Sequence, residues 1–234
     1  MMIKWIEVLP KTGKEQAFST AQETWHETAQ CSGFEGQLGG WCKIKNEQSE
    51  VDHITSQAML LAFWRDMSAI DDFMATKHDD IADNNNQART YESCTVHYLQ
   101  SELRFGALLT SSIKEMDVND IGFIRIADCS LKVDDTGLAE QTFFHDQTHV
   151  WDPAMQACDG MIGGAVARFI KQDNRFLVIS FWQNKASHQT YMTDAFQTAK
   201  SQVNLSSYID KLTGYQIVIE PNWSILNGYR FSDI

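Results

Sequence analysis

Basic residues are scarce in this sequence. Its 19 Lys and Arg stand against 31 Asp and Glu, which gives a formal net charge of −12 at pH 7, and no segment gathers Lys and Arg into a basic run. Such a chain repels phosphate backbones and anionic membrane surfaces. We therefore expect neither nucleic acid nor a membrane as a partner.

Long apolar runs are missing as well. The first residues, MMIKWIEVLPKTGKEQ, contain no apolar segment of signal-peptide length. No later stretch approaches the length of a membrane span. The sequence accordingly predicts a cytoplasmic protein.

Motifs for metals, nucleotides and serine nucleophiles are absent. The five cysteines, at positions 31, 42, 94, 129 and 158, form no C-x-x-C pair and have no histidine at zinc-finger spacing. We expect reduced, mostly buried thiols and no metal site. The sequence also contains no G-x-S-x-G, Walker or G-x-G-x-x-G pattern, which argues against the common nucleophile-elbow and nucleotide-binding classes.

What the sequence does contain is an internal repeat. GQLGG at residues 36–40 returns as GMIGG at 160–164, and LLAFWRDMSAIDDFM at 60–74 aligns without a gap with VISFWQNKASHQTYM at 178–192. The separation falls from 124 to 118 positions, so the first copy has six extra residues, which fit a hairpin in the polar stretch 45–57. Aligned aromatic residues in the same order indicate a duplication.

Each copy has the pattern of a β-α-β-β-α-β unit. The first copy predicts strands at 2–8, 39–45, 58–64 and 93–99, with helices over 12–30 and from Ser68, where Asp71 completes a capping-box-like start. The second predicts strands at 122–131, 163–170, 175–182 and 214–220, with helices over 137–151 and 187–205. Residues 58–64 are apolar at consecutive positions, so we expect that strand to be buried on both faces.

One such unit forms a four-stranded antiparallel sheet with both helices on one face and leaves the other face uncovered. Two units in one chain can cover each other and close a barrel. We therefore predict an α+β fold of two ferredoxin-like repeats. The predicted ranges are 1–100 for the first half, 101–120 for a connector, 121–220 for the second half and 221–234 for a tail. Homodimerisation of the closed barrel stays open.

Five segments of the first copy resemble a known family: KWIEV at 4–8, GFEGQLGGW at 33–41, LAFWRD at 61–66, FMATKHDDI at 73–81 and ARTYES at 88–93. They are similar to the uncharacterised bacterial YdbC-like branch of the dimeric α+β barrel superfamily, which includes antibiotic-biosynthesis monooxygenase-like and stress-responsive proteins. The resemblance implies the barrel fold. It does not imply one activity, because the superfamily includes oxygenases, heme degraders, peroxidase-like enzymes, isomerases and proteins without known activity.

The heme-degrading members use an Asn on the first strand with a Trp and a His on the last helix of the unit. The corresponding positions here fall near Glu7 and on Phe73 or Tyr191, so that signature is absent. We predict no cofactor, and we retain heme, bound through His78 or His149, as an alternative.

His78 is the leading candidate for catalysis. It stands four residues after Met74 and three before Ile81, which places it on the apolar face of its helix, and its counterpart in the second copy is Phe196. An imidazole at that position can relay a proton or bind a ligand. The alternative is a histidine that packs at the edge of the core.

Glu7 and Tyr91 are further catalytic candidates, because a carboxylate and a hydroxyl near His78 would complete a proton-transfer site. We predict that a ligand pocket between sheet and helices is lined by Trp64, Arg65, Phe73, Met74, Trp182 and Tyr191. For the matched Trp64 and Trp182, core packing is the simpler explanation, and lining the pocket is the alternative. His145 and His149 have a spacing that can share a metal, but without a third ligand in sequence we interpret them as part of a solvated face.

Two functions stay open at this point. The first is an enzyme that binds a small apolar or aromatic molecule, a cofactor-independent, monooxygenase-like oxidoreductase with His78 as acid or base. The second is a non-catalytic ligand-binding or stress-associated protein in which His78 only packs. The lining of the cavity in each half distinguishes them.

Overall fold

The computed structural model describes residues 1–45 and 54–226. In this part of the chain eight strands close into a barrel in the hydrogen-bonded order β1-β3-β2-β8-β5-β7-β6-β4. The fold is the predicted α+β barrel of two repeats. The described residues form two compact units. The first comprises those within Met1–Leu99, Ser112–Val118 and the segment from Ile217, and the second comprises Gln100–Ser111 and Asn119–Gln216.

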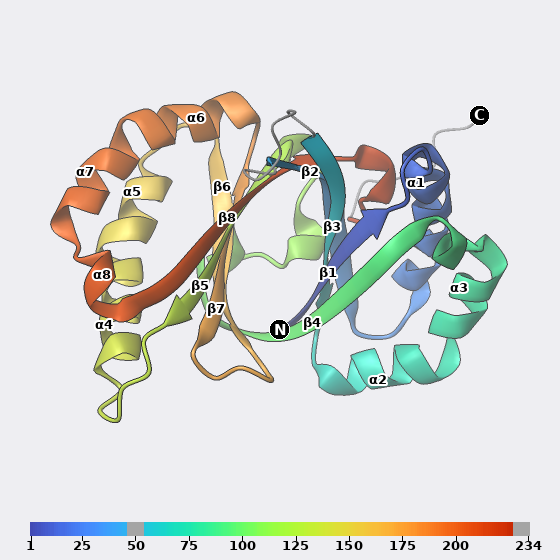
Figure 1. Cartoon of the computed structure of the whole chain (residues 1–234), viewed down its shortest axis with the longest axis horizontal. Helices are drawn as coiled ribbons and strands as arrows, with labels where there is room; N and C mark the ends of the chain where they lie inside the picture. Colours follow the sequence, from blue (N-terminus) through green and yellow to red (C-terminus); the bar gives the residue numbers. More distant parts are fainter. Residues whose placement is uncertain (46–53, 227–234) are drawn as a thin grey trace. The chain divides into compact units, whose positions relative to one another are not determined.

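The first unit has the predicted order of elements. Its elements are β1 (Met2–Pro10), α1 (Glu15–Glu23), the 3₁₀-helix η1 (Thr24–Gln30), β2 (Phe34–Lys45), β3 (Ile54–Trp64), α2 (Met67–Thr76), α3 (His78–Asn85) and β4 (Tyr91–Gly106). The chain passes from the first unit into the second within β4. Figure 1 shows α1, α2 and α3 along one side of β1 and β3. Both faces of the described end of β3, residues 58–64, are buried, as its apolar run predicts.

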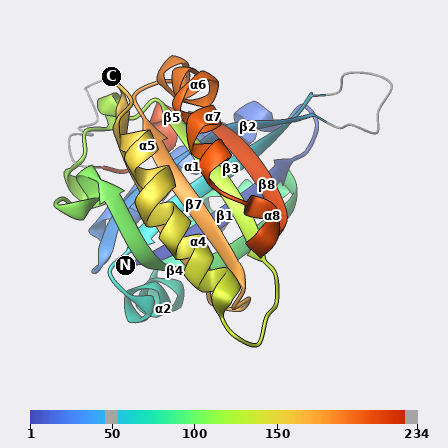
Figure 2. The same cartoon turned by 90° about the vertical axis from the view of Figure 1, so that its left-hand side faces the viewer.

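The second unit repeats this order. It contains β5 (Phe123–Leu131), α4 (Leu138–Asp146), the π-helical turn η6 (Gln147–Trp151), α5 (Asp152–Gln156), β6 (Met161–Phe169), β7 (Arg175–Trp182), α6 (Lys185–Thr193), α7 (Ala195–Gln202), α8 (Leu205–Tyr208) and β8 (Ile209–Ile219). Figure 2 shows α4 and α5 as one continuous rod across the strands of this unit. None of the described helices is long and apolar enough to cross a membrane.

Equivalent registers relate the two sheets. In the first unit Met2 pairs with Trp64 and Lys4 with Ala62. In the second unit Phe123 pairs with Trp182 and Arg125 with Ser180. The matched tryptophans therefore occupy the same place in both sheets, and Lys4 corresponds to Arg125.

GQLGG lies entirely inside β2, whereas GMIGG begins with Gly160 in the turn before β6 and continues into that strand. β2 begins at Phe34, ahead of its phrase, and its pairing with β3 shifts between Phe34 and Gly36. β6 has the matching shift between Met161 and Gly163. The β-bulge precedes GQLGG but falls inside GMIGG, at Ile162, and the glycines beside it allow close approach of neighbouring backbone. A Cβ on Gly40 would collide with the carbonyl oxygen of Val218.

Several predicted boundaries differ in the structure. The helix expected to start at Ser68 begins at Met67, because the Asp66 carboxylate accepts a hydrogen bond from the Ala69 N–H at 2.9 Å and caps it. β4 continues to Gly106, six residues into the predicted connector, and short 3₁₀ turns at Ala107–Leu109, Ile113–Glu115 and Val118–Asp120 follow. Of the predicted hairpin at 45–57, residues 46–53 lie outside the described part of the chain.

The predicted tail at 221–234 begins as an ordered part of the first unit. Its 3₁₀ turn, Pro221–Trp223, buries Trp223 completely. The indole donates a hydrogen bond to the Ser19 hydroxyl at 3.0 Å, and its ring packs against Phe18 and Trp41. An aromatic residue with these contacts belongs to a core, which is why the segment is fixed there.

Candidate functional site

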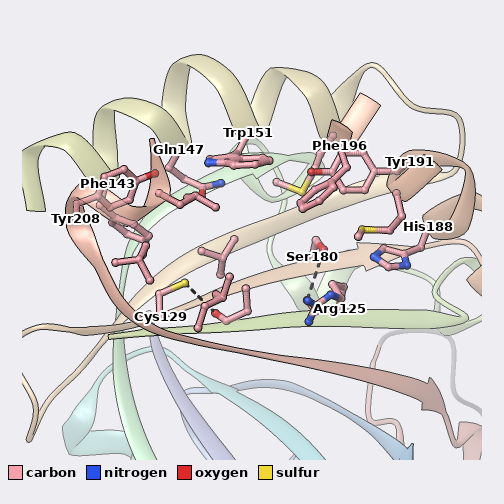
Figure 3. Close-up of a pocket in the computed structure, with 17 residues that line it drawn as sticks. Arg125, Cys129, Phe143, Gln147, Trp151, Ser180, His188, Tyr191, Phe196 and Tyr208 are labelled. Atoms are coloured by element: carbon pink, nitrogen blue, oxygen red, sulfur yellow. Dashed lines mark hydrogen bonds between the residues drawn. The ribbon is translucent and has the colours of Figure 1, made fainter. Parts of the chain in front are cut away.

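Each unit contains a cavity between its own sheet and helices, with a volume of about 140 Å³ in both cases. The first cavity is lined by Lys4, Ile6, Val8, Phe18, Gln22, Trp25, Thr28, Gln37, Leu60, Ala62, Trp64, Phe73, His78, Ala82, Gln87, Ala88, Tyr91, Cys94 and Val96. The second cavity is lined by Arg125, Ala127, Cys129, Phe143, Gln147, Trp151, Met155, Val178, Ser180, His188, Tyr191, Met192, Phe196, Leu205, Tyr208, Ile209 and Leu212. Figure 3 shows the second cavity.

The two helical walls are built from the same three residue types in the same order. The first cavity uses Phe18, Gln22 and Trp25. The second uses Phe143, Gln147 and Trp151, which have one additional residue between Gln and Trp. Sequence reasoning missed this match because that insertion interrupts a gapless alignment.

The π-helical turn η6 accommodates the extra residue. Four residues of an α-helix advance about 40° beyond one full turn, so a row at spacing four drifts off a single face. Phe143, Gln147, Trp151 and Met155 nevertheless all line the second cavity. The wider turn at Gln147–Trp151 offsets the drift. In the first unit the corresponding stretch tightens into the 3₁₀-helix η1.

A buried imidazole distinguishes the second cavity. His188 on α6 is 1% exposed, and its Nε2 atom has no hydrogen-bond partner. Its ring lies 5.0 Å from that of Phe123 and 5.4 Å from that of Trp182, measured between centroids. Burial lowers the pKa of His188 to about 4, and the charges of Arg125 and Lys185 act in the same direction. The imidazole is therefore neutral at pH 7.

Arg125 supplies a cation at the same end of the cavity, as Figure 3 shows. Its Nη1 atom donates hydrogen bonds to the carbonyl oxygens of Tyr215, at 3.0 Å, and Ile126. A Cβ on Gly214 would collide with the guanidinium group, so glycine makes room for it. These contacts hold a fixed positive charge in the sheet wall, next to the neutral His188.

Two phenols and an amide complete the polar lining of the second cavity. Burial raises the pKa values of Tyr191 and Tyr208, so both hydroxyls stay protonated. The Gln147 amide donates a hydrogen bond to the buried carboxylate of Asp152, whose pKa burial raises to about 6. The remaining lining side chains are mostly apolar, which suits an aromatic ring.

The first cavity has a different polar lining. A chain of hydrogen bonds runs from the Trp25 indole to Gln87 at 2.8 Å and from the Gln87 amide to Gln22 at 2.9 Å. This chain fixes the helical wall. Lys4 and Trp64 from the sheet, and His78 from α3, face the same space.

The structure brings only some of the predicted catalytic residues together. His78 and Tyr91 both line the first cavity, and Phe196, the counterpart of His78, lines the second. His78 is partly exposed, and its Nδ1 atom lies 2.8 Å from the Asp79 carboxylate. Glu7 does not join them. Side chains alternate along a strand, so Glu7 lies on the opposite face of β1 from Lys4 and Ile6, where it contacts His97 at 3.4 Å.

The predicted pocket residues divide in a similar way. Trp64 and Phe73 line the first cavity and Tyr191 lines the second. The other three lie outside both linings. Arg65 is exposed, and its Nε atom lies 2.8 Å from the Asp66 carboxylate. The Met74 sulfur lies 3.6 Å from the Lys4 ammonium nitrogen. Trp182 is fully buried, and its indole N–H donates a hydrogen bond to the Ser180 hydroxyl at 2.9 Å.

Sequence reasoning missed His188, although a signal was present. At the separation of 118 positions His188 aligns with Ile70, which is 1% exposed. A histidine that replaces a core isoleucine in one copy of a repeat indicates a buried imidazole. Lys4 and Arg125 are 121 positions apart, so their equivalence emerges from the strand registers and not from the separation of 118.

Each cavity is smaller than a heme group. An apolar cavity of about 150 Å³ holds one benzene-sized molecule, so a volume of about 140 Å³ is far too small for a tetrapyrrole. His149 lines neither cavity and stacks on His145 at the surface, with 4.4 Å between ring centroids. His78 packs against the rings of Trp25 and Phe73.

Comparison with known proteins places the first unit in a family. Residues 2–99 match the family described as Domain of unknown function (DUF4937). The protein YdbC of Bacillus subtilis (strain 168), described as uncharacterized, is 30% identical over 105 residues, which are 45% of this chain and 82% of YdbC. The chain belongs to the DUF4937 family. Its second unit extends beyond the matched residues.

Solved structures similar to this DUF4937 protein share its barrel. A provisionally assigned monooxygenase from Fusobacterium nucleatum superposes with a TM-score of 0.70 at 10% identity, over 93% of this chain and 91% of that one. Another from Lactobacillus acidophilus NCFM gives 0.68 at 14% identity, over 97% and 96%. An anthrone oxidase-like protein gives 0.57 at 9% identity, over 94% and 91%. At these identities the likeness establishes the fold.

Proposed function

We propose that this protein binds a small aromatic molecule in the second cavity and oxidises it with molecular oxygen, without a cofactor. One observation carries the proposal. His188 presents a buried Nε2 atom without a hydrogen-bond partner at the wall of an otherwise apolar cavity, beside the guanidinium group of Arg125. A neutral base next to a cation suits a substrate that becomes an anion.

The substrate class follows from the lining. The volume of about 140 Å³ accommodates one aromatic ring, and the rings of Phe143, Trp151 and Phe196 provide apolar and edge-to-face contacts for it. An activated methylene or an acidic hydroxyl attached to that ring would meet His188 and Arg125. The acidic atom of the substrate would then lie between the His188 imidazole and the Arg125 guanidinium group.

The proposed chemistry begins with proton transfer from the substrate methylene to Nε2 of His188. The carbanion is stabilised by the charge of Arg125, and its negative charge raises the pKa of the new imidazolium. The carbanion then forms a C–O bond with O₂, and His188 returns its proton to the peroxide. Loss of the second C–H proton breaks the O–O bond. Overall, CH₂ and O₂ give C=O and H₂O, so carbon loses the four electrons that oxygen gains.

The barrel neighbours support oxygen as the first oxidant to test, because three of them carry monooxygenase or oxidase-like names. His78 stays a prediction for an acid or base in the first cavity. We place the reaction in the second cavity because His188 is buried with a free nitrogen, whereas His78 is partly exposed and already contacts Asp79.

The test is oxygen uptake, measured with an electrode, on a panel of single-ring phenols, hydroquinones and ketones with a benzylic methylene. We expect His188→Gln to lower the rate at least 100-fold for any substrate the wild type consumes, a loss typical of a missing general base. His145→Gln, at an exposed position, is the matched control. Uptake abolished by His78→Gln but not by His188→Gln would move the reaction to the first cavity.

Binding is measured separately by calorimetry with the same panel. Affinity for single-ring compounds without oxygen uptake would leave a ligand-binding protein and overturn the enzymatic part of the proposal. No binding to any single-ring compound would overturn both parts.

A further inference from the structure

The first cavity contains a buried cation without an acidic partner. Lys4 is 6% exposed and lines the cavity wall. Its ammonium group contacts the sulfur of Met74 at 3.6 Å and lies 5.7 Å from the centroid of Phe73. Among the described residues no carboxylate forms an ion pair with it, since the acidic neighbour on its own strand, Glu7, points to the other face of β1.

A buried charge without a partner is costly, so proteins pair such charges or place them where a ligand completes the pair. The sulfur of a thioether is a weak acceptor, and an aromatic face offers only a partial interaction. Cys94 is the titratable group on β4 that faces Lys4, and it is a thiol rather than a carboxylate. Lys4 therefore has no anionic partner among the described residues, although its charge is buried.

A second hydrogen-bond donor without an acceptor belongs to a residue that lines the same cavity. The indole Nε1 atom of Trp64 is fully buried and has no hydrogen-bond partner, and its side chain is 1% exposed. A buried N–H group left unpaired costs free energy comparable to a lost hydrogen bond. The counterpart, Trp182, differs, because its indole donates to Ser180 at 2.9 Å.

Both donors lie on one face of the sheet. Lys4 pairs with Ala62 and Met2 pairs with Trp64, so Lys4 and Trp64 are diagonal neighbours on the face that lines the cavity. Phe73 connects them: its ring centroid lies 5.0 Å from that of Trp64 and 5.7 Å from the Lys4 nitrogen. A single ligand in this cavity can accept from both donors.

We propose that the first cavity is a binding site for a small aromatic carboxylate, whose carboxylate accepts from the ammonium group of Lys4 and the indole N–H of Trp64. The carboxylate supplies the missing negative charge and two oxygen acceptors. The ring fills a volume of about 140 Å³, against the side chains of Phe18 and Trp25. This site is separate from the reaction proposed for the second cavity and does not depend on it.

The experiment is isothermal titration calorimetry with benzoate, and with benzyl alcohol as the uncharged ligand of similar shape. We expect the wild type to prefer benzoate roughly 10- to 100-fold, the range for hydrogen bonds to charged groups. Lys4→Met keeps the length of the side chain and removes the charge, and it should abolish that preference. Trp64→Phe should weaken benzoate binding several-fold while leaving affinity for benzyl alcohol nearly unchanged.

Lys114→Met is the matched control, because it removes an exposed lysine of the same unit. His188→Gln, in the second cavity, shows whether the heat comes from the other unit. The proposal is overturned if benzyl alcohol binds as tightly as benzoate, if Lys4→Met retains the preference, or if benzoate does not bind at millimolar concentration. Failure of oxygen uptake has no bearing on these outcomes, so the two proposals are distinguishable.

Discussion

Buried ionisable residues divide the two cavities by chemistry. Lys4 and Arg125 occupy equivalent positions in their sheets. Arg125 reaches backbone carbonyl oxygens, whereas the contacts of Lys4 are a sulfur atom and an aromatic ring. His188 stands where the first unit has Ile70. The duplicated scaffold thus places one cation in each cavity but gives it different partners, which we expect to give each cavity its own ligand preference.

Replacing Lys4 by methionine should stabilise the protein at neutral pH. Burial lowers the pKa of Lys4 below 10.5, so the unfolded chain holds its proton to higher pH than the folded one. The resulting penalty is full below the folded pKa and disappears as the pH approaches 10.5. Urea unfolding should show Lys4→Met gaining roughly 1 to 3 kcal/mol at pH 7 and progressively less toward pH 10.5.

The Lys114→Met control should show no such gain at either pH. A destabilised Lys4→Met at pH 7, with the fold intact, would mean that the ammonium group has a stabilising partner after all.

Replacing His188 by isoleucine, the residue of the first copy, should remove an acid-sensitive contribution. The pKa of His188 falls from 6.5 to about 4 on folding, so the folded state binds fewer protons between those values and loses stability as the pH drops through them. The loss is on the order of 3 kcal/mol. Urea unfolding at pH 4.5, 5.5, 6.5 and 7.5 should give a flatter profile for His188→Ile.

Asp152 acts in the opposite direction over nearly the same range, because its raised pKa of about 6 makes the folded state bind more protons. Asp152 contributes equally to the stability of both proteins, so its contribution cancels when the unfolding free energy of the wild type is subtracted from that of His188→Ile. Parallel profiles for the two proteins would show that the His188 imidazole is not the group responsible.

The cavity residues that sequence reasoning found and missed have physical explanations. His78 could be placed on an inner helix face from Ile81, three residues later in α3. Its spacing from Met74 gave no valid support, because the chain leaves the helix at Lys77 between α2 and α3. Glu7 was assigned to the wrong side of its sheet, although strand alternation relative to Ile6 and Val8 would have corrected it. His188 was within reach, since it aligns with Ile70 at the constant separation of 118. The match of Trp25 with Trp151 was not, because a one-residue insertion after Gln147 interrupts the constant separation.

At the scale of elements, the helical walls of the two cavities differ by one residue in the spacing between their Gln and Trp side chains. Trp25 follows Gln22 by three residues, where α1 passes into the 3₁₀-helix η1, and Trp151 follows Gln147 by four residues, across the π turn η6. Helix existence could be predicted from apolar periodicity, but not these departures from 3.6 residues per turn. The strands β2 and β4 are longer than predicted, because backbone pairing continues through residues whose composition suggests turns.

Deleting the exposed Thr148 should convert the π turn to regular α-helix, because it restores the spacing of the first copy. The flanking helices keep their register when a single inserted residue is removed, so the free energy of unfolding should change by less than about 1 kcal/mol. Affinity for single-ring ligands in the second cavity should fall, since Gln147 and Trp151 move closer together. Chemical unfolding and calorimetry measure the two effects. A loss above about 3 kcal/mol would contradict this view of the turn.

Gly40, in the strand β2, gives a second prediction at the scale of elements. A Cβ at Gly40 would collide with backbone of Val218, which cannot move without breaking the pairing of β2 with β8. Gly40→Ala should therefore destabilise the protein by more than about 3 kcal/mol. Gly13→Ala, where a Cβ meets open space, should cost only about 1 kcal/mol for its positive φ. Equal costs in thermal unfolding would argue against a steric role for Gly40.

At the scale of the whole molecule, the described chain returns after β8 to the unit where it began. β8 belongs to the second unit up to Gln216 and to the first unit from Ile217. The duplication predicted two continuous halves. It could not predict this return, because the deciding contacts are made by residues after the last strand, which have no counterpart in the first copy. Backbone hydrogen bonds between Gln37 and Ile225, at 2.9 and 2.8 Å, hold the returning segment in place.

Trp223→Ala should therefore weaken the first unit selectively. The substitution removes a fully buried indole together with its contacts to Phe18, Trp41 and Ser19. A cavity of that size costs about 3 to 5 kcal/mol. Hydrogen exchange should show faster exchange in α1 and β2 while β5 and β7 stay protected. Val218→Ala, on an exposed side chain of β8, should change stability by less than about 0.5 kcal/mol. Equal loss of protection in both units would contradict the prediction, because it would mean that the two units unfold together. Loss of protection confined to residues after Glu220 would also contradict it, because the segment would then not stabilise the rest of the first unit.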